Sequence, residues 1–151
     1  MVGEPAPDFT LPATSGLEIT LGGCRGGKVV LYFYPKDNTP GCTNESKDFR
    51  DLHERFVAAG CTVFGISRDS VKSHENFKAK FELPFELLSD RDETACEAYQ
   101  VMKLKNMYGR QVRGIERSTF LIDANGLVAR EWRKVKVPGH AAEVLESALS
   151  L

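Results

Sequence analysis

The fold is decided by the stretch Val29-Val30-Leu31-Tyr32-Phe33-Tyr34-Pro35-Lys36-Asp37-Asn38-Thr39-Pro40-Gly41-Cys42. Its first six residues are apolar on both faces of an extended chain and stop at Pro35, which is typical of a strand buried inside a sheet. A loop of turn-forming residues follows. A helical pattern then runs from about Cys42 to Ala59, with Gly60 as its C-terminal stop. We therefore predict a strand, a loop and a helix in this order, with an apolar helical face made of Phe49, Leu52, Phe56 and Val57.

The rest of the chain continues the alternation of short β-rich runs and longer helical stretches. Asn125-Gly126 lies between two apolar runs and predicts a hairpin turn. This alternation favours an α/β fold with at least some parallel strands, and 151 residues suit one domain covering 1–151. We expect strands at 62–66, 85–88, 118–123 and 127–132, and helices at 70–81, 92–99 and 141–151, the last docking through Val144, Leu145, Ala148 and Leu149.

Composition and charge limit the possible partners. The 20 Lys and Arg against 21 Asp and Glu leave a formal charge of -1, which provides no field for nucleic acid or an anionic membrane. The N-terminus lacks a secretory signal pattern, and no apolar run approaches the length of a membrane span. Four unevenly spaced cysteines make a secreted disulfide framework a poor fit. We expect a cytoplasmic protein with a small or neutral substrate.

Cys42 is the strongest candidate for chemistry. It lies just beyond the carboxyl end of a buried strand, where open α/β sheets bind ligands, and on the first turn of a helix. The free N–H groups and positive dipole end of that turn stabilise a thiolate. Thr39 can cap the helix or hold its hydroxyl near the sulfur, and Pro35 can stiffen the loop and shield the thiolate. The alternative is that Cys42 is only a packing residue, but its neighbours are loop formers.

These residues also resemble a known family. Pro35, Thr39 and Cys42 match the Pro-x-x-x-Thr-x-x-Cys signature of the peroxiredoxins, and the stretch 32–43 is similar to the bacterioferritin-comigratory, or peroxiredoxin Q, branch. The likeness covers almost the whole chain. Its other segments are Pro5-Ala6-Pro7-Asp8-Phe9, Gly65-Ile66-Ser67-Arg68-Asp69-Ser70, the stretch 114–123 and Pro138-Gly139-His140.

The resemblance implies a thioredoxin-like fold with a central mixed sheet flanked by helices. It implies reduction of hydrogen peroxide and organic hydroperoxides without a metal or bound cofactor, and a monomeric protein. By matching position it makes Cys42 the peroxide-attacking cysteine, places Thr39 and Pro35 in its pocket, and makes Arg117 the active-site arginine. A guanidinium near Cys42 would stabilise the thiolate and the charge that develops on the departing oxygen.

The second cysteine of the family's cycle is where this chain departs from the pattern. Lys47 and Lys78 stand at the two positions where relatives carry a resolving cysteine. We therefore expect a one-cysteine cycle, with thioredoxin, glutaredoxin or a low-molecular-weight thiol as the reductant. Cys24, among glycines, is the remaining resolving candidate. Cys61 opens a central strand and Cys96 lies within a helical stretch, so both suit packing.

Other classes of protein fit the sequence less well. A disulfide oxidoreductase needs Cys-x-x-Cys, but position 45 is Glu. A phosphatase loop would place Arg closer to Cys42 than Arg50. A metal site needs clustered ligands, but the three histidines, at 53, 74 and 140, are scattered and suit surface or hydrogen-bonding roles. A peroxide-sensing protein, in which Cys42 oxidises once and a partner reads the change, is the alternative function.

Overall fold

The computed structural model describes residues 1–151, and its centre is a five-stranded mixed sheet with strand order β5-β4-β3-β8-β9. The central strand β3 runs parallel to β4 and antiparallel to β8. This arrangement confirms the predicted α/β class with a mixed sheet flanked by helices. The strands are β3 Lys28–Phe33, β4 Cys61–Ser67, β5 Glu86–Ser89, β8 Ser118–Ile122 and β9 Val128–Trp132.

Side chains of β3 alternate between two apolar cores, one on each face of the sheet. Val30, Tyr32 and Tyr34 belong to one core, whereas Val29, Leu31 and Phe33 belong to the other. The core that contains Tyr32 is covered by helices α1, α2, α3 and α5. The opposite core is covered by α4 and the N-terminal segment. The helices are α1 Pro40–Asp51, α2 His53–Ala58, α3 Val71–Phe81, α4 Thr94–Ala98 and α5 His140–Leu149.

The stretch expected as one helix from 42 to 59 forms two helices instead. The break lies at Leu52, whose backbone leaves the helical region at φ -100° and ψ 2°. The break turns α2 relative to α1, so Phe49 and Phe56 are fully buried but Val57 is 58% exposed. The predicted apolar face is therefore wrong at Val57. Leu149 is likewise exposed, so the prediction that it docks with Val144, Leu145 and Ala148 is wrong at this residue.

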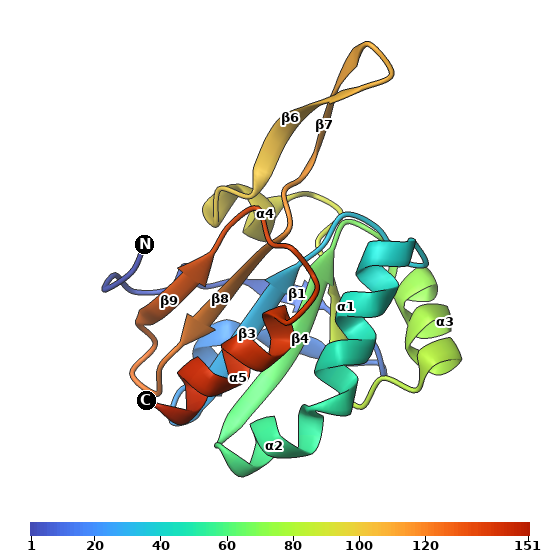
Figure 1. The fold of residues 1–151 in the computed structure, drawn as a ribbon. Coiled ribbons are helices and arrows are strands. Elements are labelled where there is room, and N and C mark those ends of the chain that lie inside the picture. The colour runs from blue at the N-terminus through green and yellow to red at the C-terminus, as the bar shows by residue number, and fades with distance from the viewer.

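Two small antiparallel units lie outside the central sheet and were not expected. One is formed by β1 Thr10–Pro12 and β2 Glu18–Thr20, followed by the short helix η1 Leu21–Cys24. The other is a hairpin of β6 Met102–Met107 and β7 Arg110–Ile115, which projects away from the rest of the molecule (Figure 1). No α-helix has the length and apolar character that a membrane crossing requires.

Candidate active site

Cys42 is the third residue of α1, directly above the carboxyl end of β3. Because an α-helix bonds each N–H to the carbonyl four residues earlier, the amides of Gly41 and Cys42 have no partner within the helix. The residue is only 1% exposed, so its sulfur lies in a largely dry environment. These free amides and the helix dipole favour negative charge at this point.

Arg117 lies in the link between β7 and β8 and reaches Cys42 across 75 residues of sequence. One guanidinium nitrogen, Nη2, donates to Cys42 Sγ at 3.4 Å, and Nη1 donates to Glu45 Oε1 at 2.7 Å. Burial acts to lower the pKa of Arg117, but Glu45 and Cys42 outweigh it and raise that pKa. The guanidinium is therefore a fixed positive charge beside the sulfur.

Gly41 leaves room for this approach. A Cβ atom at position 41 would lie 3.1 Å from Arg117 Nη2, closer than ordinary van der Waals contact. A larger residue there would require the guanidinium to shift by a few tenths of an ångström. The backbone of Arg117 is held as well, because its carbonyl accepts from the Val135 amide at 3.0 Å.

Glu45 is a site residue that sequence reasoning missed. It lies one helical turn after Cys42, is 1% exposed, and holds Arg117 through one carboxylate oxygen. Burial raises its pKa to about 7, although Arg117 pulls that pKa down. The other oxygen, Oε2, is buried without a hydrogen-bond partner, which suits a carboxyl group that takes up a proton near neutral pH. The sequence feature that could have identified Glu45 is an acidic residue three positions after the cysteine, on the inward face of the predicted helix.

Thr39 and Pro35 flank the loop that leads to Cys42. Thr39 stands at the N-cap position of α1 in an extended conformation, but its hydroxyl donates to the Lys36 carbonyl at 2.8 Å and does not cap the helix. The expectation of a side-chain cap is therefore wrong, because the loop carbonyl takes the hydroxyl proton. Pro35 is half-buried and follows Tyr34 directly.

Lys105, in the middle of β6, is a second cation, and its pKa responds to the charges of Arg117 and Cys42. Its ammonium group donates to the Ile115 carbonyl. Burial lowers its pKa, Arg117 lowers it further, and the charge of Cys42 acts in the opposite direction. Sequence reasoning missed this residue, because the hairpin that carries it was not predicted.

None of the other three cysteines lies beside Cys42, and all four are unpaired. Cys24 precedes β3 whereas Cys42 follows it, and the six residues of that strand span about 20 Å. A disulfide needs Cα atoms within about 7 Å, so the folded chain does not allow a Cys24–Cys42 bond. Burial, and then Asp8, raise the pKa of Cys24, which disfavours its thiolate. The structure therefore gives no support to Cys24 as an intramolecular resolving cysteine.

Cys61 and Cys96 are buried, as expected of packing residues. Cys61 pairs with Lys28 at the same distant end of the sheet as Cys24, and burial raises its pKa to about 12. Cys96 belongs to the core on the opposite face from Cys42, and burial raises its pKa further still. Both groups are protonated thiols at neutral pH, which makes them poor nucleophiles.

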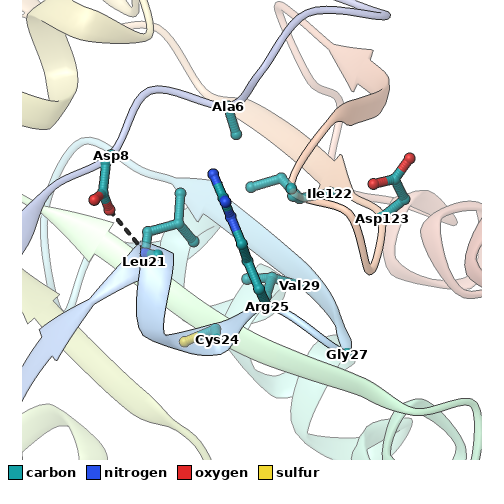
Figure 2. A pocket seen from close by; sticks show the side chains of 11 residues that line it. Ala6, Asp8, Leu21, Cys24, Arg25, Gly27, Val29, Ile122 and Asp123 are labelled. Carbon is teal, nitrogen blue, oxygen red and sulfur yellow. Dashed lines mark hydrogen bonds between the residues drawn. The ribbon is translucent and has the colours of Figure 1, made fainter.

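A surface pocket surrounds Cys24 at this distant end. Figure 2 shows Cys24 beside Arg25, with the Arg25 side chain extending between Asp8 and Ile122. The pocket is lined by residues of the N-terminal segment, of η1, of β3, and of the end of β8 with the turn that follows it, and its lining does not include Cys42. It is therefore separate from the chemistry at Cys42.

The positions of the family's resolving cysteines hold lysines. Lys47 lies on α1 and is half-buried. Lys78 lies on α3 and donates to Glu86 Oε1 and Ser15 Oγ, both at 3.0 Å. These lysines cannot form a disulfide.

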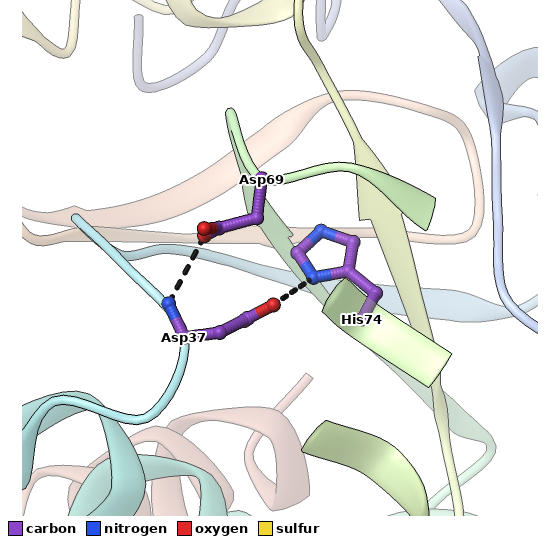
Figure 3. A group of neighbouring side chains, drawn as sticks. All are labelled: Asp37, Asp69 and His74. Carbon is purple, nitrogen blue, oxygen red and sulfur yellow. Dashed lines mark hydrogen bonds and ion pairs between the residues drawn. The ribbon is translucent and has the colours of Figure 1, made fainter. Parts of the chain in front are cut away.

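Asp37, Asp69 and His74 bring possible metal ligands within 4.8 Å of one another, so His74 is not scattered as the sequence suggested (Figure 3). Both ring nitrogens of His74 already bond to protein oxygens, one to Asp37 and the other to the Leu88 carbonyl. A metal would need a free nitrogen lone pair, so this cluster fits a hydrogen-bonded network better than a metal centre.

Comparison with known proteins agrees with this geometry. The AhpC/TSA family model matches residues 2–131. The chain is 55% identical to peroxiredoxin Bcp of Xanthomonas campestris over 93% of this chain and 89% of the relative, and 49% identical to peroxiredoxin Bcp of Bacillus subtilis over 97% and 93%.

Solved structures show the same relationship. The structure of the Xanthomonas campestris bacterioferritin comigratory protein matches with a TM-score of 0.90 and 52% identity, covering 94% of this chain and 90% of that one. Xylella fastidiosa peroxiredoxin Q matches with a TM-score of 0.94 and 44% identity, covering 99% and 96%. The chain belongs to the AhpC/TSA family and, within it, to the bacterioferritin-comigratory, or peroxiredoxin Q, branch of the peroxiredoxins.

Proposed function

We propose that this thiol-dependent peroxidase reduces peroxides through Cys42, with Arg117, Thr39 and Pro35 forming the pocket of the reacting sulfur. The observation that carries the proposal is the guanidinium of Arg117, which contacts Cys42 Sγ at 3.4 Å while bound to buried Glu45. A thiolate held between a cation and free helix amides is a stabilised anion and the reactive form of the cysteine nucleophile.

The first step forms a sulfur–oxygen bond and breaks the peroxide O–O bond. The Cys42 thiolate attacks one oxygen, the second oxygen leaves and takes up a proton, and the products are a sulfenic acid and water or an alcohol. Arg117 and the free amides at the start of α1 stabilise the charge that grows on the leaving oxygen. The Thr39 hydroxyl, whose own proton goes to the Lys36 carbonyl, can accept a hydrogen bond from the peroxide O–H. Pro35 keeps bulk water from the sulfur. Both hydrogen peroxide and organic hydroperoxides are proposed substrates, in line with the alkyl peroxide reduction described for the Xanthomonas campestris relative.

The second step uses a thiol from outside the chain, because no cysteine of this chain lies beside Cys42. One thiol displaces water from the sulfenic acid and forms a mixed disulfide. A second thiol then releases Cys42 and leaves as the oxidised disulfide. Thioredoxin, glutaredoxin or a low-molecular-weight thiol can serve.

The reaction cycle bears on the cellular compartment. Because the cycle consumes thiols, a reducing cytoplasm is the compartment that we propose. We also propose one domain and a monomer, because both cores pack on one sheet and Cys42, Glu45 and Arg117 all come from the same chain. The charge of -1 gives no reason to add a nucleic acid as a partner.

Coupled peroxide consumption tests this proposal. With dithiothreitol or thioredoxin as the reductant, the wild-type chain should turn over many times and C42S should be inactive, whereas C24S should retain activity. Mass spectrometry after one equivalent of peroxide should find a sulfenic or sulfinic mass on Cys42.

Two results would contradict the proposal. A single stoichiometric oxidation with no further consumption would indicate a peroxide sensor. A disulfide between Cys42 and Cys24, Cys61 or Cys96 would exclude the one-cysteine cycle.

A further inference from the structure

Asp37, in the loop between β3 and α1, is the centre of a buried hydrogen-bonded network. Its Oδ1 accepts from the Tyr34 hydroxyl at 2.6 Å. Its Oδ2 accepts from the Ser73 hydroxyl at 2.8 Å and faces His74 Nδ1 at 2.7 Å. Asp37 is 5% exposed and His74 is fully buried. The network therefore joins the loop before Cys42 to helix α3.

The bonding of His74 defines the charges in this network. Nδ1 faces the Asp37 carboxylate and Nε2 faces the Leu88 carbonyl at 2.9 Å, so both ring nitrogens meet acceptors. An imidazole satisfies two acceptors only when both nitrogens carry a proton. Asp37 in turn receives three donors, which is the pattern of an ionised carboxylate. The pair is a buried ion pair whose polar atoms are all bonded within the protein (Figure 3).

This ion pair holds a loop that turns at Asn38. Asn38 follows Asp37 and adopts φ +61°, a left-handed conformation that asparagine tolerates better than most other non-glycine residues. The Asp37 amide donates to Asp69 Oδ2 at 3.0 Å, so backbone and side chain of the same residue are both anchored. Thr39 and Cys42 follow within five residues, so the anchor sets where their side chains lie.

We propose that His74 is a positioning residue for peroxide reduction, acting through Asp37 to hold the loop that places Thr39 and Cys42. This inference rests on the proposed role of Cys42. His74 itself does not touch the sulfur or the peroxide. Its contribution is to keep the loop in the conformation that places the Cys42 sulfur against the Arg117 guanidinium.

Two neutral amides at position 74 separate this role from general stability. The amide nitrogen of asparagine replaces His Nδ1, so H74N keeps a donor to Asp37 and loses the bond to Leu88. Glutamine replaces Nε2, so H74Q keeps the Leu88 bond and loses the donor to Asp37. The first measurement is the second-order rate constant for oxidation of Cys42 by hydrogen peroxide. The second is the rate constant for alkylation of Cys42 by iodoacetamide, a reaction that needs the thiolate but not the peroxide pocket.

We expect H74Q to lose about 10–100-fold in the peroxide rate, the size of loss that misplacement of reacting groups causes. H74N should lose clearly less, and alkylation should fall less than peroxide reduction in both variants. Equal peroxide losses in H74N and H74Q, or a wild-type rate in H74Q, would overturn the proposal.

S70A is the matched stability control. Ser70 caps α3 by accepting from the Ser73 amide at 3.1 Å, so its loss weakens the same helix without touching Asp37. The rate of peroxide reduction by folded S70A should equal that of the wild type. If S70A loses as much of this rate as H74Q does, the effect of H74Q comes from weakening α3, and the proposal is refuted. If H74Q does not fold, S73A takes its place, because Ser73 donates to the same Asp37 oxygen. A slower S73A than S70A supports the proposal, and equal rates refute it.

The failure of this inference is distinguishable from the failure of the proposed function. If C42S is inactive and H74Q reacts like the wild type, only the role of His74 is lost. If C42S still consumes peroxide, the assignment of Cys42 itself is lost.

Discussion

At the scale of single residues, the site depends on one guanidinium that makes two contacts at once. Arg117 bonds Glu45 with one nitrogen and Cys42 with another. Only a planar fork can hold both groups in fixed directions, because a lysine ammonium is a single point charge on a flexible stem. The identity of residue 117 is therefore as important as its charge.

We predict that R117K folds but loses about 100-fold or more in the rate of peroxide reduction, as expected when a preorganised donor to the developing charge is removed. Stopped-flow measurement of Cys42 oxidation would test this. R130K is a suitable control, because Arg130 lies on β9 and makes only exposed side-chain hydrogen bonds, to Ser147 and Glu143. Comparable losses in R117K and R130K would count against the assigned role.

Glu45 should make the peroxide reaction depend on pH near neutrality. Burial raises its pKa to about 7, so the carboxylate that attracts Arg117 is formed only as the pH rises through that value. We predict that E45Q reacts more slowly than the wild type above pH 7, and that its rate profile lacks the ionisation near 7. A pH series of oxidation rates tests this, and an unchanged profile in E45Q would disprove it.

At the scale of elements, the β6–β7 hairpin is the part least supported by the core. Its strands pair only with each other, and most of its side chains are exposed, including Leu104, Met107, Tyr108 and Val112. Contacts at its base attach it to the body, where Met102 of β6 packs against the core. Buried Ile115 ends β7, and Arg113 binds Glu93 and Glu97 near α4. A two-stranded unit of this kind is only marginally stable by itself.

We therefore predict that amide hydrogens between Lys103 and Arg113 exchange orders of magnitude faster than those of β3, because local opening of the hairpin exposes no core. Hydrogen exchange followed by mass spectrometry measures both segments in one experiment. R113A should speed exchange in the hairpin and leave β3 unchanged. Equal protection of the hairpin and β3 would show that the hairpin is held by contacts beyond those described.

At the scale of the whole molecule, two buried groups give stability opposite dependences on pH. The folded-state pKa of Glu45 is above its unfolded value of 4.5, so its contribution is greatest at low pH and is lost as the pH rises towards about 7. Burial lowers the pKa of His140 to about 4 from 6.5, so its contribution is present above 6.5 and is lost as the pH falls towards 4. Between about 4.5 and 6.5 the two effects partly cancel.

Removing His140 should expose this compensation. His140 is 5% exposed and bonds the Thr119 hydroxyl through Nε2 at 2.8 Å. We predict that H140N is less stable than the wild type at pH 7 and that this difference narrows as the pH falls from 6.5 to 4, by at most about 1.4 kcal/mol per pH unit. Urea unfolding across this range measures it. A difference that stays constant or widens in acid would contradict the assigned state of His140.

The alternation of strands and helices was predictable because it depends on residues that are close together in the sequence. The apolar run before Pro35 and the helical spacing after Cys42 recur in β3 and α1, and Ser70 stands at the N-cap of α3. The β6–β7 hairpin was missed because basic residues interrupt its apolar alternation, although Tyr108 and Gly109 form its turn with positive φ. The break at Leu52 was missed because the helical spacing continues across it.

The sequence by itself determined that a buried strand leads through a turn-rich loop to a cysteine at a helix start, since periodicity and turn chemistry depend on near neighbours. It placed Arg117 at the site only by resemblance. The tertiary structure alone decided that Arg117 meets Cys42, that Glu45 is buried beneath it, that His74 anchors Asp37, and that Cys24 lies about 20 Å away beyond the other end of β3. Those facts depend on contacts between residues tens of positions apart, which follow from how the sheet and its two cores pack.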